Sequence, residues 1–168
     1  MATKQDIEKA KELAAEMLEK LGFEYETIDV DTFSPDEDED SAIEDGAEIE
    51  MIKIDIKGEQ LGNMIGRYGK TLFAFQHILT LAFNAGRSEN RARLIVDINN
   101  YREKREKELT EYAERALVEV RQSNLPMALP PMKPVERRIV HLALKKEEGI
   151  VTTSEGDEPN RYVVIKPA

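Results

Sequence analysis

The chain has 168 residues, a net charge of −10 and no cysteine. This length accommodates one medium domain or two small ones, and the lack of cysteine excludes disulfides, thiolate metal sites and thiol nucleophiles. The sequence contains neither a signal peptide nor an apolar run of about 20 residues, so it predicts neither export nor membrane insertion, and we expect a cytoplasmic protein.

The negative charge is concentrated in the first third of the chain. Residues 1–58 contain 19 acidic and 6 basic side chains, whereas residues 59–168 contain 15 acidic and 18 basic ones. Non-specific affinity for nucleic acid depends on Lys and Arg displacing counterions from phosphates. The net charge alone disfavours a phosphate-rich partner, but the basic groups lie where the motifs described below occur.

The N-terminal part predicts a helix followed by two strands. Thr3 and Asp6 have the spacing of a capping box, and apolar residues recur at helical spacing from there to Gly22. Residues 23–33 are rich in β-branched side chains and alternate as in a strand. Residues 52–56 alternate isoleucine with charged residues, as in a sheet with one face exposed to solvent. The predicted elements are a helix over 4–21, a strand over 23–33, a solvated acidic loop over 34–47 and a strand over 52–56 that ends at Gly58.

Two further helices and a third strand complete this part of the chain. A short helix near 60–66 is interrupted by a turn, and a longer one ends at Ala85-Gly86. The third strand, at 91–99, again alternates, so the order of elements is αββααβ. The side chains predicted to face the core from the longer helix are those of Leu72, Phe75, Leu79 and Ala82, and those from the strand are Ala92, Leu94, Val96 and Ile98.

The rest of the chain predicts a second small α+β domain. A charged helix over 101–122 carries a narrow apolar stripe, and several prolines then hold the chain extended around 127–129. Pro134 suits the first turn of a helix that runs to about Lys146. Strands over 150–154 and 161–166 close the chain, which predicts two helices and a three-stranded antiparallel sheet. We place the domain boundaries at 1–100 and 101–168.

The turn Gly66-Arg67-Tyr68-Gly69 has two interpretations. Glycine has no Cβ to block the approach of a phosphate backbone, the amides that begin the following helix attract anions, and Arg67 and Lys70 add positive charge. Turns of this GXXG form clamp single-stranded nucleic acid in some recognition modules. Without its context, a tight helix–helix turn is the commoner interpretation. For Tyr68, stacking on a base and capping of the turn remain open.

The αββααβ order with GXXG between its fourth and fifth elements resembles a type II KH domain over about residues 1–99. The resemblance implies a three-stranded sheet with helices on one face and a site for single-stranded RNA, or single-stranded DNA, at the turn. The residues that it assigns to this site are Ile65, Gly66, Arg67, Tyr68, Gly69 and Lys70.

A second candidate site lies on the helix that begins at Pro134. Arg137 and His141 are four residues apart and therefore share one face, which Lys145 continues, and Arg138 adds charge beside them. Arginine can bind a phosphate with two N–H groups, and histidine can donate a hydrogen bond or stack on a base. The alternative, which is favoured without further context, is a solvated helix face.

The Arg-x-x-x-His spacing, preceded by Pro130-Pro131-Met132 and followed by the segment 151–156, is similar to the nucleic-acid-binding domain named for that motif. Placed after a KH domain, it resembles the bacterial Jag family over nearly the whole chain. The resemblance implies an RNA chaperone or post-transcriptional regulator linked to cell elongation, division and envelope homeostasis. It also implies a second small KH protein or a homodimer as partner. Many members carry an additional N-terminal Jag domain, which we expect this chain to lack.

Two functions of other classes remain as alternatives. One is a protein-interaction scaffold or dimerisation module that acts through a partner KH protein, with incidental RNA contact. An enzyme such as a nuclease comes third, because the two histidines are 64 positions apart and the carboxylates lie mostly in the acidic loop. The loop resembles the start of an EF-hand, but Ser41 and Ala47 occupy positions that require Gly and Glu. We therefore expect a non-enzyme with no metal and no cofactor.

Overall fold

A computed structural model describes residues 3–33, 50–87 and 91–168 of the chain. It divides into two compact units, Met1–Tyr101 and Arg102–Ala168. The acidic loop predicted over 34–47 lies outside the described residues. Across the described parts, none of the helices combines the length and the apolar composition that crossing a membrane requires.

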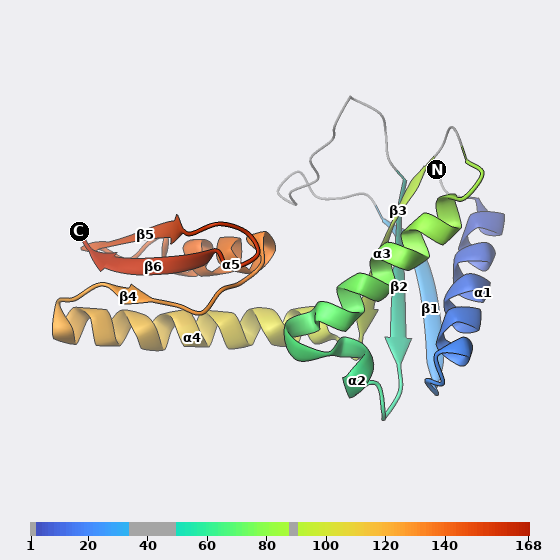
Figure 1. Cartoon of the computed structure of the whole chain (residues 1–168), viewed down its shortest axis with the longest axis horizontal. Coiled ribbons are helices and arrows are strands. Elements are labelled where there is room, and N and C mark those ends of the chain that lie inside the picture. The colour runs from blue at the N-terminus through green and yellow to red at the C-terminus, as the bar shows by residue number, and fades with distance from the viewer. Residues whose placement is uncertain (1–2, 34–49, 88–90) are drawn as a thin grey trace. The chain divides into compact units, whose positions relative to one another are not determined.

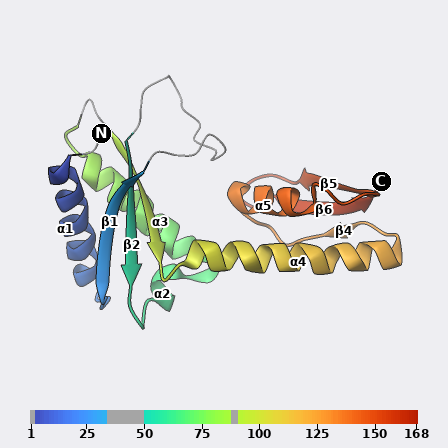
Figure 2. The same cartoon turned by 180° about the vertical axis from the view of Figure 1, so that it is seen from behind.

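The first unit is a three-stranded sheet with helices on one face, as the αββααβ order predicts (Figures 1 and 2). The elements in chain order are α1 (Lys4–Lys20), β1 (Thr27–Phe33), β2 (Glu50–Lys57), α2 (Gly62–Ile65), a single 3-10 turn (Arg67–Gly69), α3 (Lys70–Asn84) and β3 (Ala92–Ile98). In the sheet, β2 lies in the middle, antiparallel to β1 and parallel to β3.

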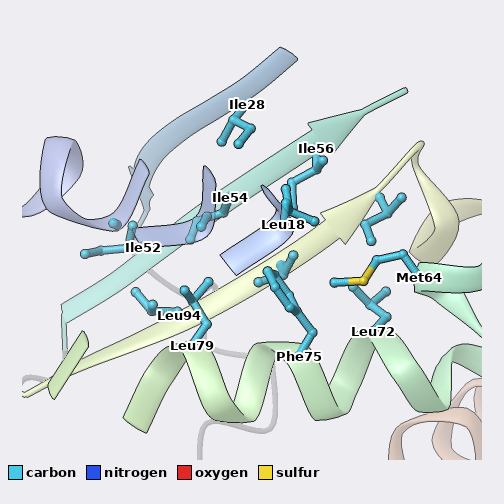
Figure 3. Close-up of a cluster of buried hydrophobic side chains, with 14 of the residues drawn as sticks. Leu18, Ile28, Ile52, Ile54, Ile56, Met64, Leu72, Phe75, Leu79 and Leu94 are labelled. Carbon is cyan, nitrogen blue, oxygen red and sulfur yellow. The ribbon is translucent and has the colours of Figure 1, made fainter. Parts of the chain in front are cut away.

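The core of this unit lies between the sheet and the two long helices. Alternate residues of β2 and β3 point to the same side and are almost completely buried, as their period of two predicts. Helix α1 adds Ala10, Ala14 and Leu18 to this layer, and α3 adds larger side chains. Figure 3 shows this layer in close-up. The buried residues include Leu18 from α1, Ile52, Ile54 and Ile56 from β2, Leu72, Phe75 and Leu79 from α3, and Leu94 from β3.

Two details of the sequence prediction are wrong. Ala82 is exposed, and Phe83 takes the predicted place in the core with no exposed surface. A step of four residues from Leu79 keeps Phe83 on the buried face of the helix, whereas a step of three turns Ala82 toward its edge. The first strand begins at Thr27 rather than at residue 23, and Phe23 instead packs against the core from the connection that precedes β1.

The second unit packs two helices on one face of a small antiparallel sheet. The elements are α4 (Tyr101–Ser123), β4 (Met127–Ala128), α5 (Pro134–Leu144), β5 (Ile150–Glu155) and β6 (Tyr162–Pro167), and the strand order in the sheet is β4-β6-β5. The buried stripe of α4 and the apolar side of α5 cover Val163 and Ile165 of the central strand. This architecture is the predicted one, and the helix α5 has Pro134 at its first position.

Candidate nucleic-acid interface

The GXXG turn between α2 and α3 has a backbone that ordinary residues rarely adopt. Gly66 has φ 70° and ψ −178°, a combination that is essentially restricted to glycine. Tyr68 and Gly69 then follow with φ 53° and φ 68° in the left-handed region. Three positive φ angles within four residues reverse the chain between the two helices, and α3 begins directly afterwards at Lys70.

Each glycine of the turn also faces a close neighbour. A Cβ at Gly66 would lie 2.1 Å from the hydroxyl of Thr71, and one at Gly69 would lie 2.7 Å from the ring of Tyr101. Both contacts are far below van der Waals distance. The internal geometry of the turn therefore requires both glycines, in addition to any close approach of a ligand.

The turn presents its charged and aromatic side chains to solvent. Arg67, Tyr68 and Lys70 are exposed, whereas Gly69 is buried and Ile65 packs partly against the core. The Arg67 guanidinium carbon lies 5.3 Å from the centroid of the Tyr68 ring, which is within cation–π range. Tyr68 is 48% exposed, so its ring does not belong to the core. The surface of the turn thus combines two cations with an accessible aromatic ring.

Helix α5 brings Arg137 and His141 together on the face that it turns toward β5. The Nδ1 atom of His141 lies 2.7 Å from the hydroxyl oxygen of Thr152, and its Nε2 atom lies 2.8 Å from that of Ser154. Both ring nitrogens are therefore engaged. Burial, with the nearby charge of Arg137, lowers the pKa of His141 below its ordinary value of 6.5, which favours the neutral ring at pH 7.

Arg137 is the more buried member of the pair, with 7% of its surface exposed. Its Nε donates a hydrogen bond to the Met132 carbonyl at 3.3 Å, and a terminal nitrogen forms an ion pair with Glu158. Arg138 and Lys145, by contrast, are exposed, and Lys145 lies just past the last residue of the helix. The motif thus has two parts. Arg137 and His141 form hydrogen bonds within the protein, whereas Arg138 and Lys145 are exposed cations.

Sequence reasoning did not identify the residues that hold Arg137 and His141. Thr152 and Ser154 lie on alternate positions of one strand, so their hydroxyls share a face, and that spacing was an available signal. Glu158 lies in the connection between β5 and β6, and no sequence pattern links it to Arg137. The pairing becomes visible only in the folded unit.

Comparison with known proteins places the second site in a known domain family. The family model of the domain named for its Arg-x-x-x-His motif matches residues 107–167, which include Arg137 and His141, and this match confirms the predicted domain. A protein of Clostridium symbiosum named RNA-binding protein KhpB is 37% identical over 114 residues, which are 68% of this chain and 51% of that protein.

Two further relatives carry the same name. The protein of Streptococcus pneumoniae strain D39 is 29% identical over 177 residues, covering 98% of this chain and 52% of its own length. The protein of Bacillus subtilis strain 168 is 34% identical over 118 residues, covering 68% of this chain and 55% of its own length. The chain spans about half the length of these curated relatives.

Proposed function

Because this chain belongs to the Jag family, we propose that it binds single-stranded RNA through two surfaces, one on each unit. The first surface is the turn Gly66–Gly69 with Lys70. The second is the α5 face of Arg137 and His141, with Arg138 and Lys145 at its exposed side. We propose that the protein acts by binding, without catalysing a reaction, and in the cytoplasm.

The arrangement of buried and exposed residues in the GXXG turn supports this proposal most directly. The turn buries Gly69 against Tyr101 while it exposes Arg67, Tyr68 and Lys70. Exposed cations displace counterions from phosphates, and an exposed ring provides a stacking platform for a base. Of the two interpretations of Tyr68, its exposure supports stacking.

The cellular role that we propose is that of an RNA chaperone or post-transcriptional regulator linked to cell elongation, division and envelope homeostasis. The resemblance to the Jag family supports this role. Two linked sites of low affinity are compatible with this role, because together they bind RNA more tightly than either site alone and can still release it.

The first surface can be tested by removing its charges. Fluorescence anisotropy with a labelled single-stranded RNA should show at least a severalfold loss of affinity for the variant Arg67→Gln with Lys70→Gln. A matched control, Lys4→Gln with Lys11→Gln, removes the same charge from exposed positions on α1 and should change affinity much less. Equal losses in the two double variants would show that only net charge matters and would contradict a site at the turn.

A second candidate function is assembly with a partner KH protein or with a second copy of the chain. Two large apolar side chains on α3, Ile78 and Leu81, support it because they are 55% and 60% exposed. Size-exclusion chromatography after nuclease treatment separates the two functions. A dimer or partner complex that persists without nucleic acid would favour assembly, whereas a monomer that binds RNA would favour the first proposal.

A further inference from the structure

The guanidinium of Arg137 is held by one buried partner and one exposed partner. The Met132 carbonyl accepts from its Nε, and the carboxylate of Glu158 pairs with its terminal nitrogen. The Arg137 side chain is 9% exposed, whereas that of Glu158 is 51% exposed. Glu158 belongs to the connection between β5 and β6, outside either strand. The carboxylate is therefore the partner that another anion can replace from solvent.

The backbone of Arg161 is linked to this pair through Met132. The Met132 N–H donates to the Arg161 carbonyl at 3.0 Å, while the carbonyl of the same Met132 accepts from Arg137. Arg161 has the sequence parity of Val163 and Ile165, which face the helices of the second unit. Arg161 directly precedes β6, and we infer from this parity that its side chain lies on the side of the sheet that carries Arg137 and His141.

Arg161 has a buried donor without an acceptor. Its Nε is buried, and within the described ranges of the chain no hydrogen-bond partner reaches it. A buried N–H without a partner is costly and therefore uncommon in folded proteins. An acceptor supplied by a ligand would satisfy this donor.

We propose that Arg137 and Arg161 form a binding subsite for one RNA phosphate, and that Glu158 occupies the place of this phosphate in the free protein. Guanidinium groups pair with carboxylates and phosphates in the same planar geometry, so one anion can exchange for the other. On binding, a phosphodiester oxygen accepts from the terminal nitrogen of Arg137, a second accepts from Arg161, and Glu158 moves into solvent.

This subsite deepens the proposed function and rests on it. The charge of the neighbouring His141 does not contribute, since its lowered pKa leaves the ring neutral at pH 7. The two arginines with Glu158 carry a net charge of about +1, and the departure of Glu158 leaves both arginines for the phosphate. RNA affinity is then limited by competition with an internal carboxylate.

The direct test compares two glutamates that each pair with an arginine of the second unit. Glu158→Gln removes the competitor, so affinity for a labelled single-stranded RNA should rise about fivefold by anisotropy. Glu147→Gln is the control, because Glu147 pairs with Arg121 at 2.9 Å and its loss removes the same charge. The control should change affinity less than about twofold. An unchanged or weakened affinity for Glu158→Gln relative to the control would overturn the exchange.

The role of Arg161 has its own pair of variants. Arg161→Gln should lower affinity about tenfold, the loss expected for one charge-assisted contact, whereas Arg121→Gln should lower it less than about twofold. Circular dichroism melts verify that both are folded, and Arg161→Lys, which keeps the charge but lacks the Nε donor, should show an intermediate loss. Equal losses of RNA affinity for Arg161→Gln and Arg121→Gln would show that Arg161 does not belong to the subsite.

A measurement on the unmodified chain makes the test independent of folding effects. In nitrogen-15 spectra, the Nε–H signal of Arg161 should shift when RNA is added, and that of Arg121 should stay unchanged. A stationary Arg161 signal in a chain that binds RNA would contradict the subsite alone. Absence of RNA binding by the unmodified chain would instead contradict the proposed function, so the two failures are distinguishable.

Discussion

Gly66 and Gly69 combine a structural and a functional requirement in four residues of chain. Each has a positive φ, and each faces a neighbour that leaves no room for a side chain. Replacing them with aspartate would therefore strain the fold as well as repel RNA. Loss of binding in such a variant would not by itself identify the site, and the charge variants of Arg67 and Lys70 are the cleaner test.

The requirement for Gly69 can be measured as stability. Gly69→Ala should lower the free energy of unfolding by about 2 kcal/mol, because alanine is strained at φ 68° and its Cβ would meet the Tyr101 ring. Gly62→Ala, where no atom lies within 4 Å of the added Cβ, should be neutral or slightly stabilising. Urea unfolding of both variants checks this, and equal stabilities would contradict the contact with Tyr101.

Asp6 connects the start of α1 to the segment after α3. A hydrogen bond from Arg87 and others from Thr3 lower the pKa of its carboxyl from 3.8 to about 2. Because the folded pKa lies below the unfolded one, the stabilisation is complete above about pH 4 and is lost as the pH falls toward 2.

Asp6→Asn should therefore cost about 1–2 kcal/mol of unfolding free energy at pH 7. The difference from the unmodified chain should shrink as the pH falls from about 4 to about 2. Chemical denaturation at several pH values measures it, with the exposed change Glu8→Gln on the same helix as control. A difference that does not depend on pH would contradict the ion pair with Arg87.

His141 should titrate below its ordinary value of 6.5 because its ring is partly buried beside Arg137. The folded state then binds its proton less readily than the unfolded state, so its contribution to stability is complete above about pH 6.5 and decreases as the pH falls. NMR titration of the ring proton signals gives the pKa directly. A value above 6.5 would contradict the burial of the ring.

At the scale of elements, the beginning of α5 is tied to α4 through Glu136. Its carboxylate accepts from Arg105 Nε of α4 at 2.7 Å and from the Lys133 N–H at 3.1 Å, so it joins two helices and caps one of them. Only 9% of its surface is exposed. The orientation of α5, and with it of Arg137, depends on this residue.

Glu136→Ala should lower the free energy of unfolding by about 1–3 kcal/mol, because it removes the acceptor of the Arg105 Nε and of the Lys133 N–H. Glu111→Ala removes a carboxylate whose pair with Arg115 is long, at 3.8 Å, and exposed, so it should cost less than about 0.5 kcal/mol. Thermal melts of the two variants compare them. Similar losses would show that Glu136 is an ordinary surface charge.

Most elements were predictable because their apolar residues alternate or recur with one clear period. Ile52, Ile54 and Ile56 indicate β2, and the stripe of α4 indicates its buried face. The start of β1 was not predictable in the same way, because Phe23 is as apolar as a strand residue although it packs from the preceding connection. Short-range patterns do not distinguish these two placements.

The candidate sites were predictable to different degrees. The GXXG turn is local, so its four residues indicate both its conformation and its exposed charges. The surroundings of Arg137 and His141 are not local, since their partners Thr152, Ser154 and Glu158 lie 11 to 21 residues away. Helical spacing placed the two residues on one face, but it could not show that this face is turned inward.

At the scale of the whole molecule, the chain is two units with separate cores, and the boundary between them falls inside α4, after Tyr101. Tyr101 packs behind the GXXG turn, and the rest of the helix contributes to the core of the second unit. Two binding surfaces on one chain raise the effective concentration of the second contact once the first has formed. Each surface alone can therefore be weak.

If both units contact RNA phosphates, the binding of RNA depends on salt through both of them, and salt titrations measure this directly. Anisotropy titrations over a range of salt concentrations give the slope of log affinity against log salt concentration, which is negative. The magnitude of this slope should fall by about 0.7 for each lost phosphate contact. The slope should fall for Arg67→Gln with Lys70→Gln, fall again for Arg138→Gln with Lys145→Gln, and fall by the sum when the pairs are combined. A slope that stays unchanged when one of these pairs is removed would contradict phosphate contacts by that pair.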